Sequence, residues 1–347
     1  MLLKKYITFE VLKNFFIIFF ILLFVLLCKS LLAHLGSADS FLVQPLLLPL
    51  VFYSTPAVLI LIIPFSFLLS VVVSLNKMYD NREMLAAKAI GMTNSQLYYL
   101  LFRISVLLAF IMFFVSFQLE PSCRAKQRQL LEQAHMQQQI EDLPVNKFFK
   151  INNMVVYIKQ LTNSLQPQNI FMVSEHVQDN KNYTNLVLAK SVDIKQADDA
   201  AVVNLHDGVS YVLADLQREL NVIGFGDYQI SLPYRKSGLG SVKEYFATKL
   251  IAMNSAVSQA LLYWRASLVV FILILSVIGF AVAKTEVSAG SMSIVLAVGV
   301  YVAYILSLLV GKRLIEQGVV NYITLFGSIH LFFLCGALGA IRARYKL

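Results

Sequence analysis

Long apolar stretches alternate with short polar segments along this chain, and one wide polar region separates the first three stretches from the last three. A helix needs roughly 20 mostly apolar residues to cross the hydrocarbon of a bilayer. The pattern therefore predicts six transmembrane helices. To within a few residues they cover Phe15–Ala33, Pro56–Leu75, Leu97–Leu119, Ala266–Ala283, Met292–Val310 and Tyr322–Ile341.

The first stretch resembles a signal peptide in length, but no small-residue cleavage site follows it. Leu27, which precedes Cys28, is too large for a lipoprotein cleavage box. We therefore expect this stretch to remain as an anchor.

The wide polar region runs from Pro121 to Ser255 and changes character along its length. It begins with "RAKQRQLLEQAHMQQQIED", which favours a polar helix, and continues with short runs rich in β-formers, such as "NMVVYIKQL" and "NIFMVSEHV". Asn, Asp and Gly separate these runs, which is typical of a sandwich or jelly-roll. The expected fold is an α-helical integral membrane protein with six transmembrane helices and an all-β, jelly-roll-like periplasmic domain between helices three and four. The expected domains are 1–120, 121–260 and 261–347.

Composition supports the membrane class and excludes several others. Hydrophobic residues make up 58% of the 347 residues and charged residues 14%, which is too apolar for a soluble domain of this size. The net charge of +9 does not indicate nucleic-acid binding, because many basic residues lie beside apolar runs, where they meet lipid head groups. Three scattered cysteines are too few for a disulfide framework.

The basic residues also predict the orientation, because short cytoplasmic loops carry an excess of Lys and Arg. One set of loops and termini is clearly the more basic, while the short loops of the other side offer Lys29, Lys312 and Arg313. The more basic side, with both termini and the segment after Asp80, is therefore expected to be cytoplasmic. Its basic residues are Lys4, Lys5, Lys13, Lys77, Arg82, Lys88, Lys284, Arg342, Arg344 and Lys346.

No catalytic or metal-binding pattern stands out, and we expect neither catalytic residues nor a metal site. The five histidines lack metal-ligand spacing, and no Gly-rich phosphate loop ends in Lys-Ser or Lys-Thr. Acidic residues are missing from the interiors of the six stretches, which argues against an ion-coupled carrier. His330 lies inside the last stretch, and we interpret it as a neutral imidazole bonded to a neighbouring helix.

The segment "DNREMLAAKAIGMTNSQL" between the second and third stretches predicts a short cytoplasmic helix. Asp80 or Asn81 is the expected N-cap, Gly91 the expected C-terminal stop, and Thr93 begins a second capping box at the third stretch. At 100° per residue, Glu83 falls on one face with Ala86, Ala87 and Ile90. Two interpretations stay open and are compatible: Glu83 enters a groove on a partner protein, or it caps its own helix.

The same segment carries a family resemblance. "REMLAAKAIG", Arg82–Gly91, resembles the coupling helix of the LptF/LptG permeases, which belong to the lipopolysaccharide-export ABC transporter, and Glu83, Ala89 and Gly91 coincide with its motif. The layout of three spans, an outward β-domain and three more spans covers essentially the whole chain. "YWRASL" at 263–268 and "FGDYQISL" at 225–232 are closer to the LptF branch. "AKTEVSAG", after the fourth span, departs from the family pattern, so no role is carried over to that loop.

The resemblance implies the partners and the energy source. Such a permease pairs with its paralogue LptG and with two copies of the ATPase LptB, while the β-domain joins LptC and, through it, LptA. ATP and Mg²⁺ would bind the ATPase, and this chain would hold no cofactor of its own. The residues implied to couple to the ATPase are Arg82, Glu83, Ala86, Ala87, Ile90 and Gly91.

The resemblance also implies where the lipid passes. Spans one and five would line its lateral path, with Lys29 and His34 near the lipid phosphates, although Lys29 alone also fits a snorkelling anchor. In span five, the small residues Ser293, Ala297, Gly299 and Ala303 fit either packing within the chain or a gate against the partner permease.

The expected function is that of a non-enzymatic permease subunit that extracts lipopolysaccharide from the inner membrane. One alternative is a non-transporting scaffold that presents the β-domain to periplasmic partners. Another is a permease for lipoprotein or a different lipid, which the number of spans disfavours.

Overall fold

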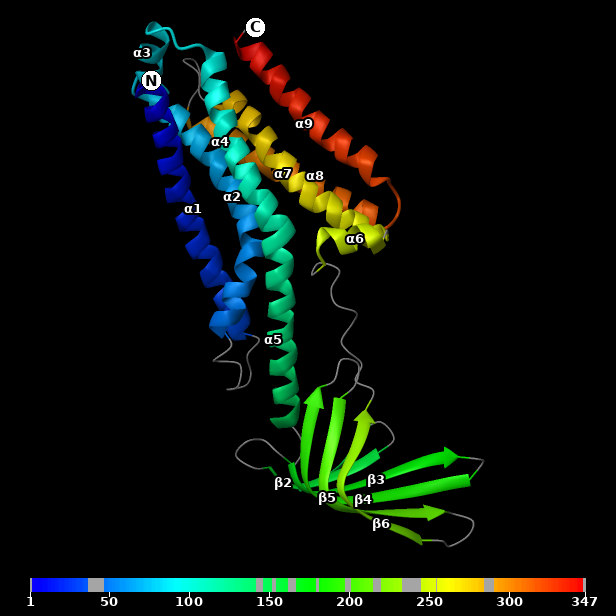
Figure 1. Cartoon of the computed structure of the whole chain (residues 1–347). Helices are drawn as coiled ribbons and strands as arrows, with labels where there is room; N and C mark the ends of the chain where they lie inside the picture. The colour runs from blue at the N-terminus through cyan, green and yellow to red at the C-terminus, as the bar shows by residue number, and fades with distance from the viewer. Residues whose placement is uncertain are drawn as a thin grey trace. The chain divides into compact units, whose positions relative to one another are not determined.

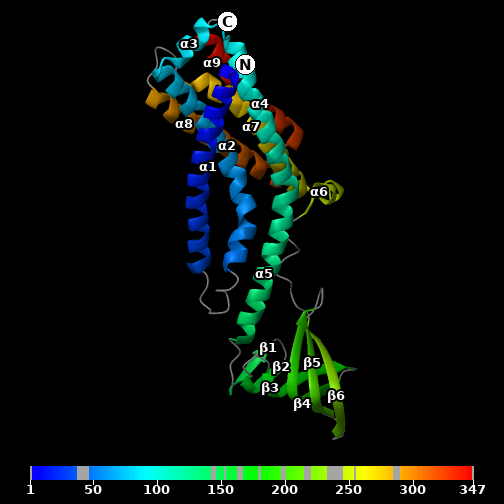
Figure 2. The same cartoon turned by 60° about the vertical axis from the view of Figure 1, so that its left-hand side comes forward.

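The computed structural model divides the chain into two compact units, Met1–Leu131 with Gly240–Leu347, and Glu132–Leu239. Figures 1 and 2 show the helices of the first unit and the strands of the second. The described residues are 2–36, 47–141, 146–151, 154–161, 167–178, 181–196, 201–214, 220–232, 245–253, 255–283 and 290–345. The helical unit takes in residues 121–131 and 240–260, which the sequence pattern assigns to the polar domain.

The first unit is helical, and six described helices are long and apolar enough to cross a membrane, as predicted. They extend beyond the apolar stretches because the helices continue into polar residues; α4 runs through a π-helical turn into α5, so that Asn94–Leu131 forms one candidate span. The elements are α1 (Leu2–Gly36), α2 (Leu47–Asp80), α3 (Glu83–Ala89), α4 (Asn94–Phe114), the π-helix η2 (Val115–Leu119), α5 (Glu120–Glu141), α6 (Ala247–Met253), α7 (Ala256–Val282), α8 (Gly290–Glu316) and α9 (Tyr322–Tyr345). The residues of α5 after Leu131 belong to the second unit.

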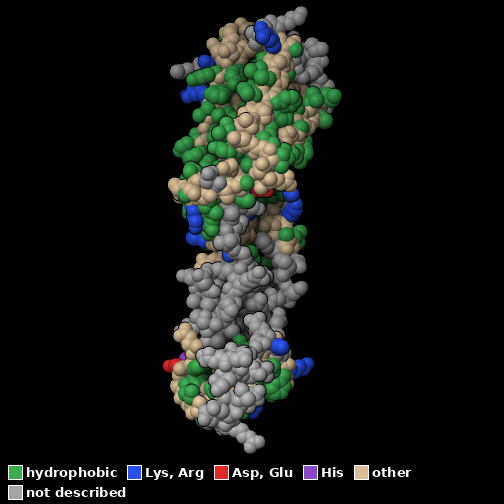
Figure 3. All heavy atoms as spheres, turned by 90° about the vertical axis from the view of Figure 1, so that its right-hand side faces the viewer, with side chains coloured by type: hydrophobic (Ala, Val, Ile, Leu, Met, Phe, Trp, Pro, Cys, Tyr) green, Lys and Arg blue, Asp and Glu red, His purple; other side chains and the backbone are tan. Residues whose placement is uncertain are grey.

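The core of this unit is built around α7, which packs against α2, α4, α8 and α9. In the most apolar 18-residue stretch of α7, 72% of the residues are buried inside the chain. The same share is 6% for α1 and 28% for α8. Gly279 allows the close approach to α2, because a Cβ there would lie 3.0 Å from Val71 Cγ1. On the face shown in Figure 3, hydrophobic side chains form a band over the helices, with Lys and Arg side chains above and below it. Helices α1 and α8 therefore keep large apolar faces for lipid or another protein.

His330 on α9 makes the interhelical hydrogen bond that the sequence interpretation expects. Its Nδ1 lies 2.5 Å from the hydroxyl oxygen of Tyr304 on α8, and both residues are buried. The Tyr304 ring also stacks on Phe333, with centroids 4.0 Å apart. This cluster joins α8 to α9.

The small residues of α8 (Gly290–Glu316) lie on two different faces of the helix. Ser293 and Ala297 are buried within the chain, whereas Gly299 and Ala303 are exposed. The two interpretations of these residues therefore apply to different members of the set, and packing within the chain accounts for the first pair.

The second unit contains an antiparallel sheet whose described strands follow chain order, β1-β2-β3-β4-β5-β6. This confirms the all-β prediction, and the described strands form one bent meander where the sandwich pattern would have two packed sheets (Figure 1). The strands are β1 (Phe148–Ile151), β2 (Met154–Leu161), β3 (Pro167–Gln178), β4 (Lys181–Gln196), β5 (Ala201–Ala214) and β6 (Leu220–Leu232). One face carries a small core that includes Val156, Met172, Val187 and Leu205.

A histidine links three neighbouring strands of this sheet. His206 on β5 lies with Nδ1 2.5 Å from Asp227 Oδ1 on β6 and with Nε2 3.4 Å from Asp193 Oδ2 on β4. The hydrogen bond with Asp227, followed by the charges of the two carboxylates, raises the pKa of His206 above its usual value despite an opposing desolvation effect.

Candidate functional site

The short helix α3 forms between two transmembrane helices, as predicted, but it begins differently. Helix α2 continues through Asp80, because Asn81 N–H still donates to Lys77 O at 2.9 Å. Asp80 and Asn81 therefore do not cap α3; its N-cap is Arg82, with φ 60° and no side-chain cap bond. The predicted C-terminal stop is confirmed, since Gly91 has φ 93° and its N–H donates to Lys88 O at 2.9 Å.

The next turn follows the sequence prediction in part. Thr93 is the N-cap of α4, and its hydroxyl oxygen accepts a hydrogen bond from the Gln96 backbone N–H at 3.3 Å. The reciprocal bond from the Gln96 side chain, which would complete the predicted capping box, is not among the hydrogen bonds of the described residues. The polypeptide is thus fixed at both ends of the four-residue link, residues 90–93, that joins α3 to α4.

Helix α3 has an inward face and an outward face. Met84 and Ala87 are each only 1% exposed and pack into the helical core. Ala87 therefore does not lie on the outward face with Ala86 and Ile90, and this part of the predicted docking surface is wrong. The outward face consists of Leu85 (42% exposed), Ala86, Ala89 and Ile90 (81% exposed), with Glu83 half-exposed at its edge.

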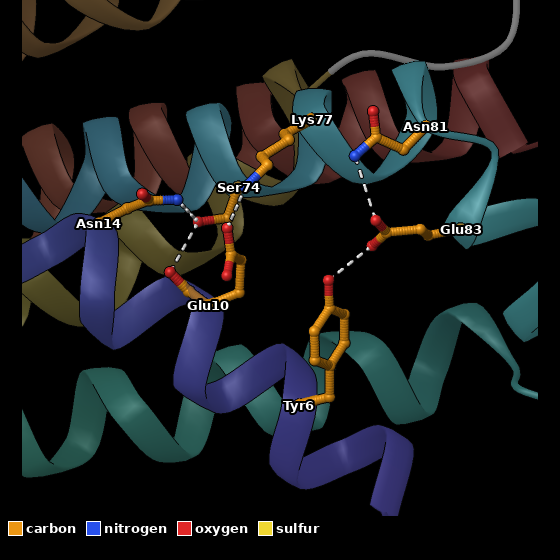
Figure 4. Close-up of polar contacts among 7 residues, drawn as sticks. All are labelled: Tyr6, Glu10, Asn14, Ser74, Lys77, Asn81 and Glu83. Carbon is orange, nitrogen blue, oxygen red and sulfur yellow. Dashed lines mark hydrogen bonds and ion pairs between the residues drawn. The ribbon is translucent and has the colours of Figure 1, made fainter.

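The Glu83 carboxylate accepts hydrogen bonds from one side chain on α1 and from another in the turn after α2 (Figure 4). Tyr6 on α1 donates its hydroxyl to Oε2 at 3.0 Å, and Asn81 donates its amide to Oε1 at 3.1 Å. Glu83 does not serve as the side-chain cap of α3, so the second interpretation from the sequence is wrong. Its described bonds instead connect α3 to the N-terminal part of α1 and to the turn after α2.

A second polar cluster joins α1 to α2 next to this contact (Figure 4). Lys77 Nζ lies 2.7 Å from Glu10 Oε1, whose side chain is 7% exposed. Asn14 donates to Ser74 Oγ at 2.8 Å. The Tyr6–Glu83 bond joins α1 to α3, and the Glu10–Lys77 and Asn14–Ser74 contacts join α1 to α2. These contacts hold α1, α2 and α3 together as one corner of the helical unit.

Sequence reasoning missed Tyr6, Glu10 and Asn14 as parts of this corner. A signal was available, because Glu10 and Asn14 are polar residues at a spacing of four along an otherwise apolar helix, which places them on one face. Their partners on α2 lie 60 and 67 positions away in the chain, so spacing alone could not identify them.

The two residues predicted to contact lipid phosphate lie toward the other end of α1. Lys29 is exposed, while the side chain of His34 lies outside the described residues. At 1.5 Å per residue, Lys29 is roughly 35 Å from Tyr6 along the helix. The structure therefore keeps the predicted coupling and lipid sites apart, although one helix carries both Lys29 and the Glu83 partner.

The described residues include no group of three or more His, Cys, Asp or Glu side chains arranged to hold a metal ion. The corner thus offers hydrogen bonds, one ion pair between the buried Glu10 and the half-exposed Lys77, and an exposed apolar face. Such a surface can bind a protein and transmit its movement.

Comparison with known proteins agrees with this architecture. A family described as lipopolysaccharide export system permease LptF/LptG matches residues 5–343. The chain is also similar to the lipopolysaccharide export system permease protein LptF of Escherichia coli strain K12, with 25% identity over 290 residues that cover 81% of this chain and 79% of the relative. The LptF proteins of Escherichia coli O157:H7 and Shigella flexneri match with the same identity and coverage. The chain belongs to the LptF/LptG family of lipopolysaccharide export permeases.

Proposed function

We propose that this permease takes lipopolysaccharide laterally from the membrane and that a separate ATPase drives the step by docking on α3. The observation that carries the proposal is the outward face of α3, where Ile90 is 81% exposed beside Leu85 and two alanines. An exposed apolar patch on a short helix between two spans is unfavourable in water and fits a groove on a partner.

The anchored Glu83 supports a coupling role for this helix. A force on α3 passes to α1 through the Tyr6 hydroxyl and to the end of α2 through Asn81. Because α1 and α2 are joined by the Glu10–Lys77 ion pair, movement of α3 would tilt both helices together.

In this proposal, ATP hydrolysis by a separate subunit supplies the energy for transport. The sequence has no Gly-rich phosphate loop, so ATP and Mg²⁺ would bind two LptB subunits. The permease would pair with LptG, and its β-unit would join LptC and LptA. We place both termini and α3 in the cytoplasm, in agreement with the distribution of Lys and Arg.

The lipid path would run along the free faces of α1 and α8. Helix α1 exposes Phe16, Phe20 and Phe24 along one side, and α8 exposes Gly299 and Ala303. Acyl chains suit the aromatic face, and small residues let the partner permease approach closely. Lys29 would meet a phosphate of the lipid.

A matched pair of variants tests the docking step. The full complex, reconstituted in proteoliposomes, would carry Ile90→Asp or the control Leu2→Asp, which alters an equally exposed apolar residue at the N-terminal end of α1 (86% exposed). We expect Ile90→Asp to abolish both ATPase association and lipopolysaccharide release, because a carboxylate would be buried in an apolar groove. Leu2→Asp should retain both.

The opposite pattern would overturn the proposal. If Ile90→Asp kept full ATPase association and lipid release, α3 would not be the docking helix. If the assembled wild-type complex moved no lipopolysaccharide while presenting its β-unit to periplasmic partners, the scaffold alternative would replace the transport function.

A further inference from the structure

A groove between the start of α1 and the start of α4 lies apart from the proposed docking face. Its volume is about 830 Å³, and residues of both helices line it. The two helices contact one another, and Figure 2 shows the N-terminus beside α4. A groove of this size can hold part of a lipid molecule.

The groove combines two kinds of surface. Lys4, Lys5 and Arg103 contribute positive charge, and all three are exposed. Phe9, Leu12, Leu100, Ile104 and Leu107 line the apolar part. None of the lining residues is acidic, and within the described part of the chain none of the three cations forms an ion pair.

We propose that this groove binds one anionic glycerophospholipid from the leaflet at the N-terminal end of α1. The phosphate would lie between Lys4, Lys5 and Arg103, and an acyl chain would lie along Phe9, Ile104 and Leu107. Cations from two separate helices facing one apolar surface match a molecule that joins an anion to hydrocarbon.

Other occupants fit the groove less well. A free phosphate would leave the apolar surface uncovered. An apolar helix of a partner would bring three cations without carboxylate partners into an apolar contact, which is unfavourable. If each cation only extended to the lipid head groups independently, the three would not need to share one groove. Lys13 is also exposed on α1, but it does not line the groove.

The site is next to the corner that holds α3. Lys4 and Lys5 directly precede Tyr6, whose hydroxyl donates to Glu83. A lipid that restrains the first turn of α1 would therefore also restrain the Tyr6–Glu83 contact. The lipid site itself does not depend on the proposed function.

Native mass spectrometry of the purified full-length chain tests the proposal. Phosphatidylglycerol, phosphatidylcholine with the same acyl chains, and glycerol phosphate would be titrated separately. We expect one tightly bound phosphatidylglycerol, weak binding of phosphatidylcholine and no competition by glycerol phosphate. Equal binding of the two lipids, or equal competition by glycerol phosphate, would overturn the lipid site.

Two sets of variants locate the site. A Lys4→Gln, Lys5→Gln, Arg103→Gln triple variant should lose roughly a hundredfold in phosphatidylglycerol affinity, since each cation near a lipid phosphate contributes about a fivefold factor. The control Lys13→Gln should change affinity little. A triple variant that binds as tightly as the wild type, or a Lys13→Gln variant that loses as much, would contradict the assignment.

The apolar part of the groove has its own matched pair. Leu107→Trp would fill the groove, whereas Val106→Trp alters the adjacent exposed residue of α4, which does not line it. We expect only Leu107→Trp to displace the bound lipid. Equal affinity for both variants would place the acyl chain elsewhere and refute the proposal.

Discussion

Removal of the Tyr304 hydroxyl tests how α8 is fixed to α9. The Tyr304→Phe substitution keeps the ring, which stacks on Phe333 and meets Phe271 edge-on at a centroid distance of 4.6 Å. It removes the hydrogen bond to His330 Nδ1, and His330 Nε2 already has no partner among the described residues. The variant would therefore leave both imidazole nitrogens without a described protein partner.

The expected loss follows from the burial of this pair. Tyr304 is 0% exposed and His330 is 5% exposed, so neither gains contact with water in the variant. Interhelical hydrogen bonds in membranes contribute about 0.6 kcal/mol on average and at most about 1.7. A buried group left without its bond adds about 1 kcal/mol or more. We therefore expect Tyr304→Phe to lower the free energy of unfolding by about 1–2 kcal/mol.

Titration with sodium dodecyl sulfate in mixed micelles, followed by circular dichroism, measures this loss. A double-mutant cycle with His330→Leu separates the bond from the packing, and Tyr99→Phe serves as the control because Tyr99 is 63% exposed. The cycle should give a coupling energy of about 1 kcal/mol. A coupling below about 0.3 kcal/mol would show that the two side chains act independently and would refute this account of the α8–α9 contact.

Three further perturbations have defined outcomes. Gly279→Ala should destabilise the helical unit by about 1 kcal/mol, because its Cβ would lie 3.0 Å from a valine on α2, while Gly327→Ala, with open space around it, should be neutral in the same detergent titration. The raised pKa of His206 means that its protonated form stabilises the β-unit at pH values below about 6.5, and this contribution is lost as pH rises through the folded-state pKa. Hydrogen exchange of residues 201–232 should therefore differ most between wild type and His206→Gln at pH 5.5–6.5 and converge at higher pH; a difference that grows with pH would contradict the sign. Lys29→Gln should weaken photocrosslinking of lipopolysaccharide at the end of α1, and an unchanged yield would identify Lys29 as an anchor only.

The apolar pattern was sufficient to predict the six spans, because hydrocarbon selects uninterrupted apolar helices. The sequence also predicted the turn at Gly91 and Thr93. Gly91 has a positive φ, which favours glycine, and Thr93 is an N-cap, where a hydroxyl can accept a backbone hydrogen bond. The start of α3 was misplaced because Asp80 has the right side chain for a cap, yet the bonds of α2 extend past it. Local capping signals cannot show where a preceding helix ends.

The faces of the helices were harder to predict. Helical periodicity placed Ala87 on one face with Glu83, but Ala87 is buried together with Met84 on the side of α3 that packs into the core. In α8 the small residues divide between two faces, which composition could not reveal. The Tyr6–Glu83 contact joins residues 77 positions apart, so it follows from tertiary packing and not from any local motif.

The most direct test of the coupling mechanism is site-specific photocrosslinking at Ile90 in living cells. A photoreactive residue at position 90 should form an adduct with a nucleotide-hydrolysing subunit, and one at Leu2 should not. If position 90 forms no such adduct while the cells export lipopolysaccharide normally, the ATPase does not act through α3 and the proposed coupling mechanism is wrong.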